Sequence, residues 1–255
     1  MYVVPTHPNG MLDLDAVNIG IADESDEHTA ATALVCIENS HNRCGGTVLS
    51  VEQVESITSL AHSHGVAVHM DGARVFNAAT ALNIPVSTLI SSVDSVMFCL
   101  SKGLSAPVGS MLVGDKEFIR KARRMRKVLG GGMRQAGILA AAGIVALEQM
   151  VKRLGEDHEN CERLAYGLAD LPQVRIQPDQ VVTNILLFSL QHTEQQPFTE
   201  SEIALFLNKA REQGVLLSRM GEKNIRAVTH AGIEAQHIEQ ALAAIRQALQ
   251  EMQRS

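Results

Sequence analysis

The sequence predicts an α/β protein built around a largely parallel sheet, and two features lead to this fold class. The first is a set of short runs, rich in β-branched and apolar residues, at 31–38, 65–71, 93–100 and 109–114. The second is an amphipathic stretch between the first two runs. Strand, helix and strand joined by short links are typical of helical layers on a parallel sheet.

The stretch SVEQVESITSLAHSHG, residues 50–65, is predicted to form that first helix. One helical face gathers the apolar side chains of Val51, Val54, Ile57 and Leu60. Ser50 and Gln53 are spaced as a capping box, and Gly65 supplies a C-terminal stop. We therefore expect the runs on either side of this helix to pair as parallel strands.

The rest of the chain alternates helix and strand in the same way. A helix is expected over 115–129, before a Gly-Gly-Gly run, and a long helical stretch over 136–171. Strands are expected at 183–190, 214–218 and 224–230, and further helices at 198–214 and 232–252. The sequence thus indicates a large domain at 1–149 and a smaller C-terminal α/β domain at 150–255.

Composition argues against nucleic acid and membranes as partners. The 255 residues carry a net charge of −6, only 3% are aromatic, and tryptophan is absent. The one basic cluster, RKARRMRK at 120–127, is either a solvated helix face or an anion-binding surface. No apolar run approaches the roughly 18 residues of a membrane span.

The four cysteines indicate a reducing, cytoplasmic setting. Their positions, Cys36, Cys44, Cys99 and Cys161, show neither metal-ligand nor redox spacing, so no metal site is expected. Cys36 and Cys99 lie inside apolar runs, where we expect the thiol to pack as a small hydrophobic side chain.

A carboxylate and a lysine follow two of the predicted strands, each beside small residues. Asp71 lies in HMDGAR and Lys102 in SKGLSAPVGS. Because carboxyl ends of parallel strands meet at one sheet edge, both side chains could face one crevice that small residues leave open. Pyridoxal phosphate requires such a pair, since an amine bonds its aldehyde and a carboxylate holds its ring nitrogen. Asp71 could instead cap a helix beginning near Ala73.

The chain resembles the low-specificity L-threonine aldolases, which are fold-type I, aspartate-aminotransferase-like enzymes. The motifs are HMDGAR (69–74), SKGLSAPVGS (101–110) and GGGMRQ (130–135), with further matches at 38–50 and 225–230. The resemblance implies a three-layer, mostly parallel sheet in the large domain, a smaller C-terminal α/β domain, and pyridoxal 5′-phosphate as cofactor.

The resemblance also implies roles for individual residues. Lys102 would bind the cofactor aldehyde, Asp71 its ring nitrogen, and Ser101 would lie near its phosphate. Arg74 and Arg226 would hold the substrate carboxylate. Taken alone, Arg226 would be interpreted as a surface arginine on an edge strand, and Ser101 as a simple turn hydroxyl.

Three more residues are candidates for the site. His41 would contact the substrate hydroxyl, and it or a water that it positions would move the proton, although a lone loop histidine is more often structural. Lys127 and Arg134, which flank the glycine run, would lie near the phosphate or the substrate entrance, with Arg134 binding the cofactor and Lys127 the substrate. In the family such residues can come from the neighbouring subunit.

The implied function is retro-aldol cleavage of L-threonine or L-allo-threonine to glycine and acetaldehyde, in a homotetramer with shared active sites. A β-eliminating lyase, an aminotransferase or an inactive oligomer-forming paralogue remain alternatives. Residues 1–15 resemble an interior segment of the family. We therefore expect an N-terminally incomplete large domain without the phosphate-binding loop, and weak cofactor binding by the chain alone.

Overall fold

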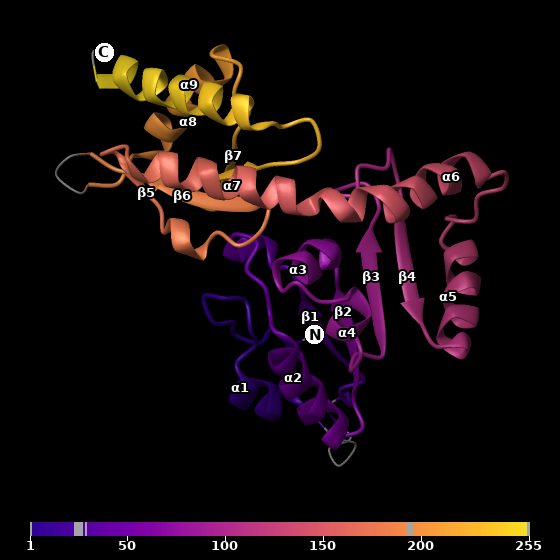
Figure 1. Cartoon of the computed structure of the whole chain (residues 1–255). Coiled ribbons are helices and arrows are strands. Elements are labelled where there is room, and N and C mark those ends of the chain that lie inside the picture. Colours follow the sequence, from indigo (N-terminus) through magenta and orange to yellow (C-terminus); the bar gives the residue numbers. More distant parts are fainter. Residues whose placement is uncertain (1, 23–27, 29, 193–195, 254–255) are drawn as a thin grey trace. The chain divides into compact units, whose positions relative to one another are not determined.

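The computed structural model of the chain describes residues 2–22, 28, 30–192 and 196–253. It divides into two compact units, whose elements are labelled in Figure 1. Unit 1 comprises Met1–His41 and Val48–Leu154, and unit 2 comprises Asn42–Thr47 and Gly155–Ser255. A short segment of the N-terminal half, residues 42–47, thus belongs to the C-terminal unit.

Unit 1 contains a four-stranded sheet in the order β1-β2-β3-β4. Its strands are β1 (Leu34–Glu38), β2 (Ala67–Asp71), β3 (Ser95–Cys99) and β4 (Ser110–Gly114). The first three are parallel and β4 is antiparallel to β3, which confirms the predicted α/β class. Parallel pairing brings the carboxyl ends of β1, β2 and β3 to one edge.

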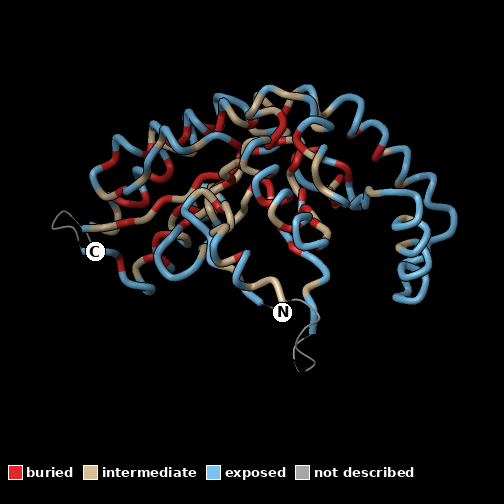
Figure 2. Tube along the Cα trace, turned by 90° about the horizontal axis from the view of Figure 1, so that it is seen from below, coloured by how far each residue is buried: buried red, intermediate tan, exposed pale blue. Residues whose placement is uncertain are grey.

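Helices cover one face of this sheet. They are α1 (Leu14–Gly20), α2 (Val51–Ser63), α3 (Val75–Ala81) and α4 (Val86–Leu89). Their buried side chains form one apolar core with residues of the three parallel strands, including Val35, Val68, Met70 and Val96. In Figure 2 the buried residues alternate with exposed ones along helices and strands, as expected for amphipathic elements.

The predicted start and stop of α2 are confirmed. The Ser50 hydroxyl accepts a hydrogen bond from the Gln53 amide, and the Gln53 side chain accepts one from the Ser50 amide. Gly65, just after the helix, has a φ of +72°, which glycine adopts without strain.

The opposite face of the sheet is open within the described residues. Leu34 is 48% exposed and Cys36 is exposed, because alternate residues of β1 point away from the helices. The expectation that Cys36 packs in the core was therefore wrong. The described part of unit 1 has a helical layer on one face of the sheet, two of the three layers that the resemblance implies.

The expected long helix over 136–171 is continuous but not regular. It consists of α6 (Gly137–Val145), a π-helical segment η2 (Ala146–Met150), a 3₁₀ segment η3 (Val151–Arg153) and α7 (Leu154–Ala169). Before it, α5 (Lys116–Val128) packs beside β4 and carries no buried residue.

Unit 2 contains an antiparallel sheet in the order β5-β6-β8-β7. The strands are β5 (Val174–Arg175), β6 (Ile185–Leu190), β7 (Ser218–Met220) and β8 (Asn224–Val228). With α7, α8 (Glu200–Glu212) and α9 (Ala235–Gln253) they enclose a core that includes Phe188, Phe206 and Ile225. The short 3₁₀ helices η1 (Asn42–Cys44) and η4 (Pro178–Gln180) complete the unit.

The strand predicted over 214–218 was wrong except for Ser218. The amides of Gly214 and Val215 donate to the carbonyls of Arg211 and Ala210, so they close the last turn of α8. These amides cannot join a ladder at the same time, and pairing with β8 begins at Ser218. Among the described helices, none is both long and apolar enough to span a bilayer.

Candidate active site

The carboxyl edge of the parallel sheet is held rigidly by backbone hydrogen bonds that continue past the strands. The Asn39 amide donates to the Asp71 carbonyl (3.0 Å), and the Gly72 amide donates to the Met97 carbonyl (2.9 Å). A Cβ atom on Gly72 would lie 2.9 Å from the Met97 oxygen, so glycine permits this close pairing. The segments leaving the three parallel strands therefore have fixed starting points.

Asp71 is the last residue of β2, and its side chain is exposed. Its Oδ1 accepts a hydrogen bond from the Ala73 amide (3.0 Å), whereas α3 begins only at Val75, with Arg74 at the N-cap. Asp71 is therefore not the cap of that helix. In the register of β1 and β2, Asp71 projects to the same face as Cys36, which is the open face of the sheet. Partial burial and the nearby charge of Asp71 raise the pKa of the Cys36 thiol.

A second carboxylate lies beside Asp71. Glu38 ends β1 and is the register partner of Asp71. Neighbouring strands are about 4.8 Å apart, and residues directly opposite each other project to the same face. Two negative charges at this edge favour a cationic group nearby.

Lys102 lies on a loop that closes on itself after β3. The Leu100 amide donates to the Gly109 carbonyl (2.9 Å), and the Ser105 amide donates to the Lys102 carbonyl (2.8 Å). Lys102 and Ser101 are both exposed. No ion pair formed by the described residues involves the Lys102 amine, so it is available to a ligand.

The small residue after Lys102 is explained in part by packing beneath the loop. Gly103 is buried, and a Cβ atom there would lie 3.0 Å from Asn77 Oδ1 and 3.1 Å from Leu154 Cδ2. Leu104 and Ala106 are buried in a small apolar cluster that includes Leu154. The residues after Lys102 therefore pack against the core and hold the loop, while Lys102 itself is exposed.

His41 follows β1 by three residues and is half-buried. Its Nε2 lies 3.5 Å from Glu38 Oε2, and its ring packs on Gly10, where a Cβ atom would come within 2.7 Å. Neither neighbour was predicted from the sequence. The rule that found Asp71 would also have found Glu38, since each is the last residue of a predicted strand.

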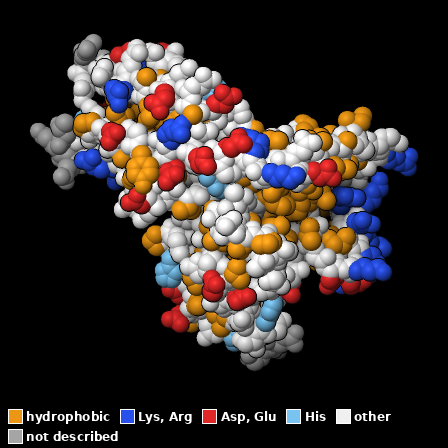
Figure 3. Space-filling view, viewed as in Figure 1, with side chains coloured by type: hydrophobic (Ala, Val, Ile, Leu, Met, Phe, Trp, Pro, Cys, Tyr) orange, Lys and Arg blue, Asp and Glu red, His pale blue; other side chains and the backbone are white. Residues whose placement is uncertain are grey.

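The structure does not bring Lys127 and Arg134 to this edge. Lys127 is in the last turn of α5, which packs beside β4 at the far end of the sheet, and Arg134 follows the glycine run. Both are exposed. Figure 3 shows the Lys and Arg side chains of α5 as a blue column beside a hydrophobic surface.

Arg226 belongs to unit 2 and does not lie on an edge strand, because β8 is paired on both sides. Its Nε is buried without a hydrogen-bond partner among the described residues. Burial lowers the pKa of this guanidinium. A buried donor without a partner suits an anionic ligand, and the guanidinium fork matches a carboxylate.

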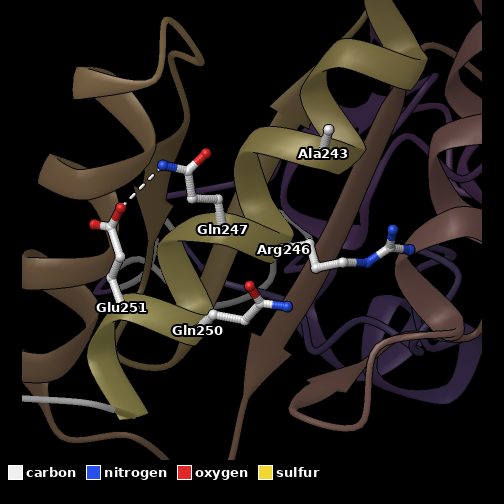
Figure 4. A pocket seen from close by; sticks show the side chains of 5 residues that line it. All are labelled: Ala243, Arg246, Gln247, Gln250 and Glu251. Atoms are coloured by element: carbon white, nitrogen blue, oxygen red, sulfur yellow. Dashed lines mark hydrogen bonds between the residues drawn. The ribbon is translucent and has the colours of Figure 1, made fainter.

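A concave region elsewhere in unit 2 offers no comparable chemistry. It is a depression of about 380 Å³ on α9, lined by Ala243, Arg246, Gln247, Gln250 and Glu251, as Figure 4 shows. Gln247 donates to Glu251 (3.0 Å), and the lining has no lysine, cysteine or histidine. Within the described ranges, no group of three or more His, Cys, Asp or Glu side chains could hold a metal ion.

Comparison with known proteins identifies the family. The family model described as "Beta-eliminating lyase" matches residues 2–191. The chain belongs to the beta-eliminating lyase family. A curated relative, low-specificity L-threonine aldolase 1 of Arabidopsis thaliana, is 40% identical over 251 residues, which are 98% of this chain and 69% of the relative. This member of the family thus spans about two thirds of that relative's length.

Solved structures agree on the fold. The threonine aldolase of Leishmania major superposes with a TM-score of 0.72 at 17% identity, over 94% of this chain and 68% of that one. The TDC protein of Oryza sativa, solved with PLP, gives a TM-score of 0.73 at 15% identity, over 98% and 55%. At these identities the likeness shows the fold alone, and this fold binds PLP in the rice protein.

Proposed function

We propose that the protein uses pyridoxal 5′-phosphate to cleave L-threonine or L-allo-threonine to glycine and acetaldehyde. The observation that carries the proposal is the shared sheet edge: Asp71 ends β2, Lys102 follows the adjacent parallel strand β3, and both side chains are exposed. The Arabidopsis relative, named as a threonine aldolase, supports this choice of reaction.

The residues present fit the cofactor. Lys102 would hold it through its amine, Asp71 through the ring nitrogen and Ser101 through the phosphate. Glu38, beside Asp71, adds negative charge that favours a protonated ring nitrogen. When bound, the cofactor supplies a sink for the electron pair released at the substrate Cα.

The remaining residues would bind and orient the amino acid. Arg74 and Arg226 are assigned to the substrate carboxylate, with the buried Nε of Arg226 as one donor. His41 is assigned to the substrate hydroxyl and would accept its proton directly or through a water. Glu38, 3.5 Å from Nε2, would orient the imidazole so that its other ring nitrogen is available.

The protein is also proposed to form a cytoplasmic homo-oligomer, a tetramer built as a dimer of dimers. β4, α5 and α6 expose many apolar side chains, including Leu112, Phe118, Val128 and Ile138. Such surfaces are typical of association sites, and Lys127 and Arg134 on this part would serve a neighbouring subunit. No disulfide joins the four cysteines, all of which the structure describes, in accord with a reducing compartment.

The test is product analysis of the cofactor-loaded protein with L-threonine and L-allo-threonine. We expect glycine and acetaldehyde in equal amounts. Pyruvate and ammonia from L-serine in place of these products would indicate a β-eliminating lyase, and a keto acid would indicate an aminotransferase. Bound cofactor with no turnover of any of these substrates would favour the inactive paralogue.

A further inference from the structure

The loop that carries His41, residues 40–48, is held at its base by one buried side chain. Asn39 is fully buried, and its Nδ2 donates to the Leu49 carbonyl (3.0 Å). Its Oδ1 accepts a hydrogen bond from the Leu49 amide (3.2 Å). One carboxamide thus closes both ends of the loop, and this base belongs to unit 1.

The tip of the same loop, Asn42–Thr47, belongs to unit 2. The fully buried hydroxyl of Thr183 donates to the Gly46 carbonyl at 2.7 Å. A Cβ atom on Gly46 would lie 2.2 Å from Thr183 Oγ1 and 3.0 Å from Ile185 Cβ, and Gly46 has a φ of +78°. Only glycine permits this approach, so the tip is fitted to the start of β6.

The tip also lies on the face of the unit 2 sheet that carries Arg226. The position of a Cβ atom on Gly45 is 3.6 Å from Leu187 Cγ, and Leu187 is the register partner of Arg226. Directly opposite residues of antiparallel strands project to the same face. The tip and the Arg226 guanidinium are therefore fixed to the same surface.

We propose that Thr183 is a positioning residue for the reaction, because it fixes the tip that begins immediately after His41. Holding Asn42–Thr47 on β6 restricts where the imidazole can lie, while Asn39 closes the base of the loop. This inference rests on the proposed function for the role of His41. It gives Thr183, which has no expected contact with substrate or cofactor, a defined effect on the step at the substrate hydroxyl.

The first test separates positioning from general stability. Thr183→Val removes the hydroxyl and keeps the shape, Thr183→Ser keeps the hydroxyl, and Thr58→Val removes a matched buried hydroxyl that donates to the Glu55 carbonyl at 3.1 Å. Each cofactor-loaded protein is assayed for threonine cleavage and for exchange of the glycine α-hydrogen with D₂O, which needs no hydroxyl on the substrate.

Thr183→Val should lower kcat for threonine about tenfold or more, with glycine exchange within about twofold of the unmodified protein. Thr183→Ser and Thr58→Val should cleave threonine nearly normally. Equal losses of cleavage and glycine exchange in Thr183→Val would overturn the proposal, because they would indicate a merely structural role.

The second test does not depend on activity. Hydrogen–deuterium exchange of the backbone amides should become faster over 42–47 in Thr183→Val and stay unchanged over 51–63. Unchanged exchange over 42–47 would show that Thr183 does not hold the loop and would overturn the proposal. If the unmodified protein cleaves no threonine, the proposed function fails separately, and this measurement still decides whether Thr183 fixes the tip.

Discussion

Asp71 illustrates how much a single residue's role depends on where the following helix begins. The sequence left open whether it caps a helix or serves a ligand, because a carboxylate before small residues suits both. In the structure α3 begins at Val75, and the Asp71 side chain is exposed beside Glu38 on the neighbouring strand. The start of α3, which decides this, has no side-chain cap and so leaves no signal in the local sequence.

Asp71→Asn should lower the turnover of threonine about 100-fold or more. This loss corresponds to about 2.7 kcal/mol or more of transition-state stabilisation. The amide keeps the shape of the side chain but loses the charge that would hold the cofactor ring nitrogen protonated. Steady-state kinetics at saturating cofactor measures the effect. Near-normal turnover would show that the carboxylate serves only the local turn with Ala73.

Arg226→Met should weaken binding of the substrate carboxylate without lowering the stability of the folded protein. Loss of a bidentate, charge-assisted contact of about 1.5–3 kcal/mol should raise KM for threonine about 10- to 100-fold. The folded protein should not lose stability, because the substitution removes a buried donor without a partner. Thermal unfolding without substrate checks the second expectation, and a large drop in Tm with unchanged KM would contradict the assignment.

Among the elements, the regular ones were predictable and the interrupted ones were not. The spacing of apolar residues and the capping box at Ser50 are local signals, so α2 was predicted to within two residues. The prediction of a strand at 214–218 was wrong because two of the amides in this segment close the last turn of the preceding helix. The π-helical segment η2 inside the long helix leaves no separate pattern in the sequence.

α7 should make the stability of the protein sensitive to acid. Burial lowers the pKa of His158 to about 4 from an ordinary value of 6.5. The unfolded chain therefore takes up a proton at His158 more readily than the folded protein does. The contribution of His158 to the free energy of unfolding is thus fully present above pH 6.5 and declines as pH falls toward 4. The limiting slope is about 1.4 kcal/mol per pH unit.

Urea unfolding at pH 7 and pH 5 measures this contribution. His158→Gln should lose less stability between the two pH values than the unmodified protein. His64→Gln, which changes an exposed histidine of unit 1, should behave like the unmodified protein. Equal acid sensitivity in all three proteins would mean that folding does not lower the pKa of His158.

At the scale of the whole molecule, the sequence predicted the fold class, the family and a shared sheet edge for Asp71 and Lys102, but not the positions of Lys127 and Arg134. The sheet edge gathers His41, Asp71 and Lys102, while Lys127 and Arg134 lie beyond β4. Local motifs could not show this, because strand order is set by pairing between distant segments. The open sheet face was equally invisible, since alternation in β1 does not reveal what covers each side.

The exposed apolar surface of β4, α5 and α6 should hold subunits together. Ile138 on α6 is 84% exposed, and Ile19 on α1, at 78%, is a matched control. Ile138→Asp should shift the mass measured by light scattering to a smaller assembly, while Ile19→Asp leaves it unchanged. A monomeric unmodified protein, or equal effects of both substitutions, would contradict this interface.

The proposed active site depends most on Lys102 as the residue that binds the cofactor. Borohydride reduction of the cofactor-loaded protein, followed by digestion and peptide mapping, locates the amine to which the cofactor is attached. We predict a pyridoxyl group on Lys102, and none on the corresponding peptide of Lys102→Ala. A label on Lys116 or Lys127 with Lys102 unmodified would contradict the assignment and, with it, the proposed active site.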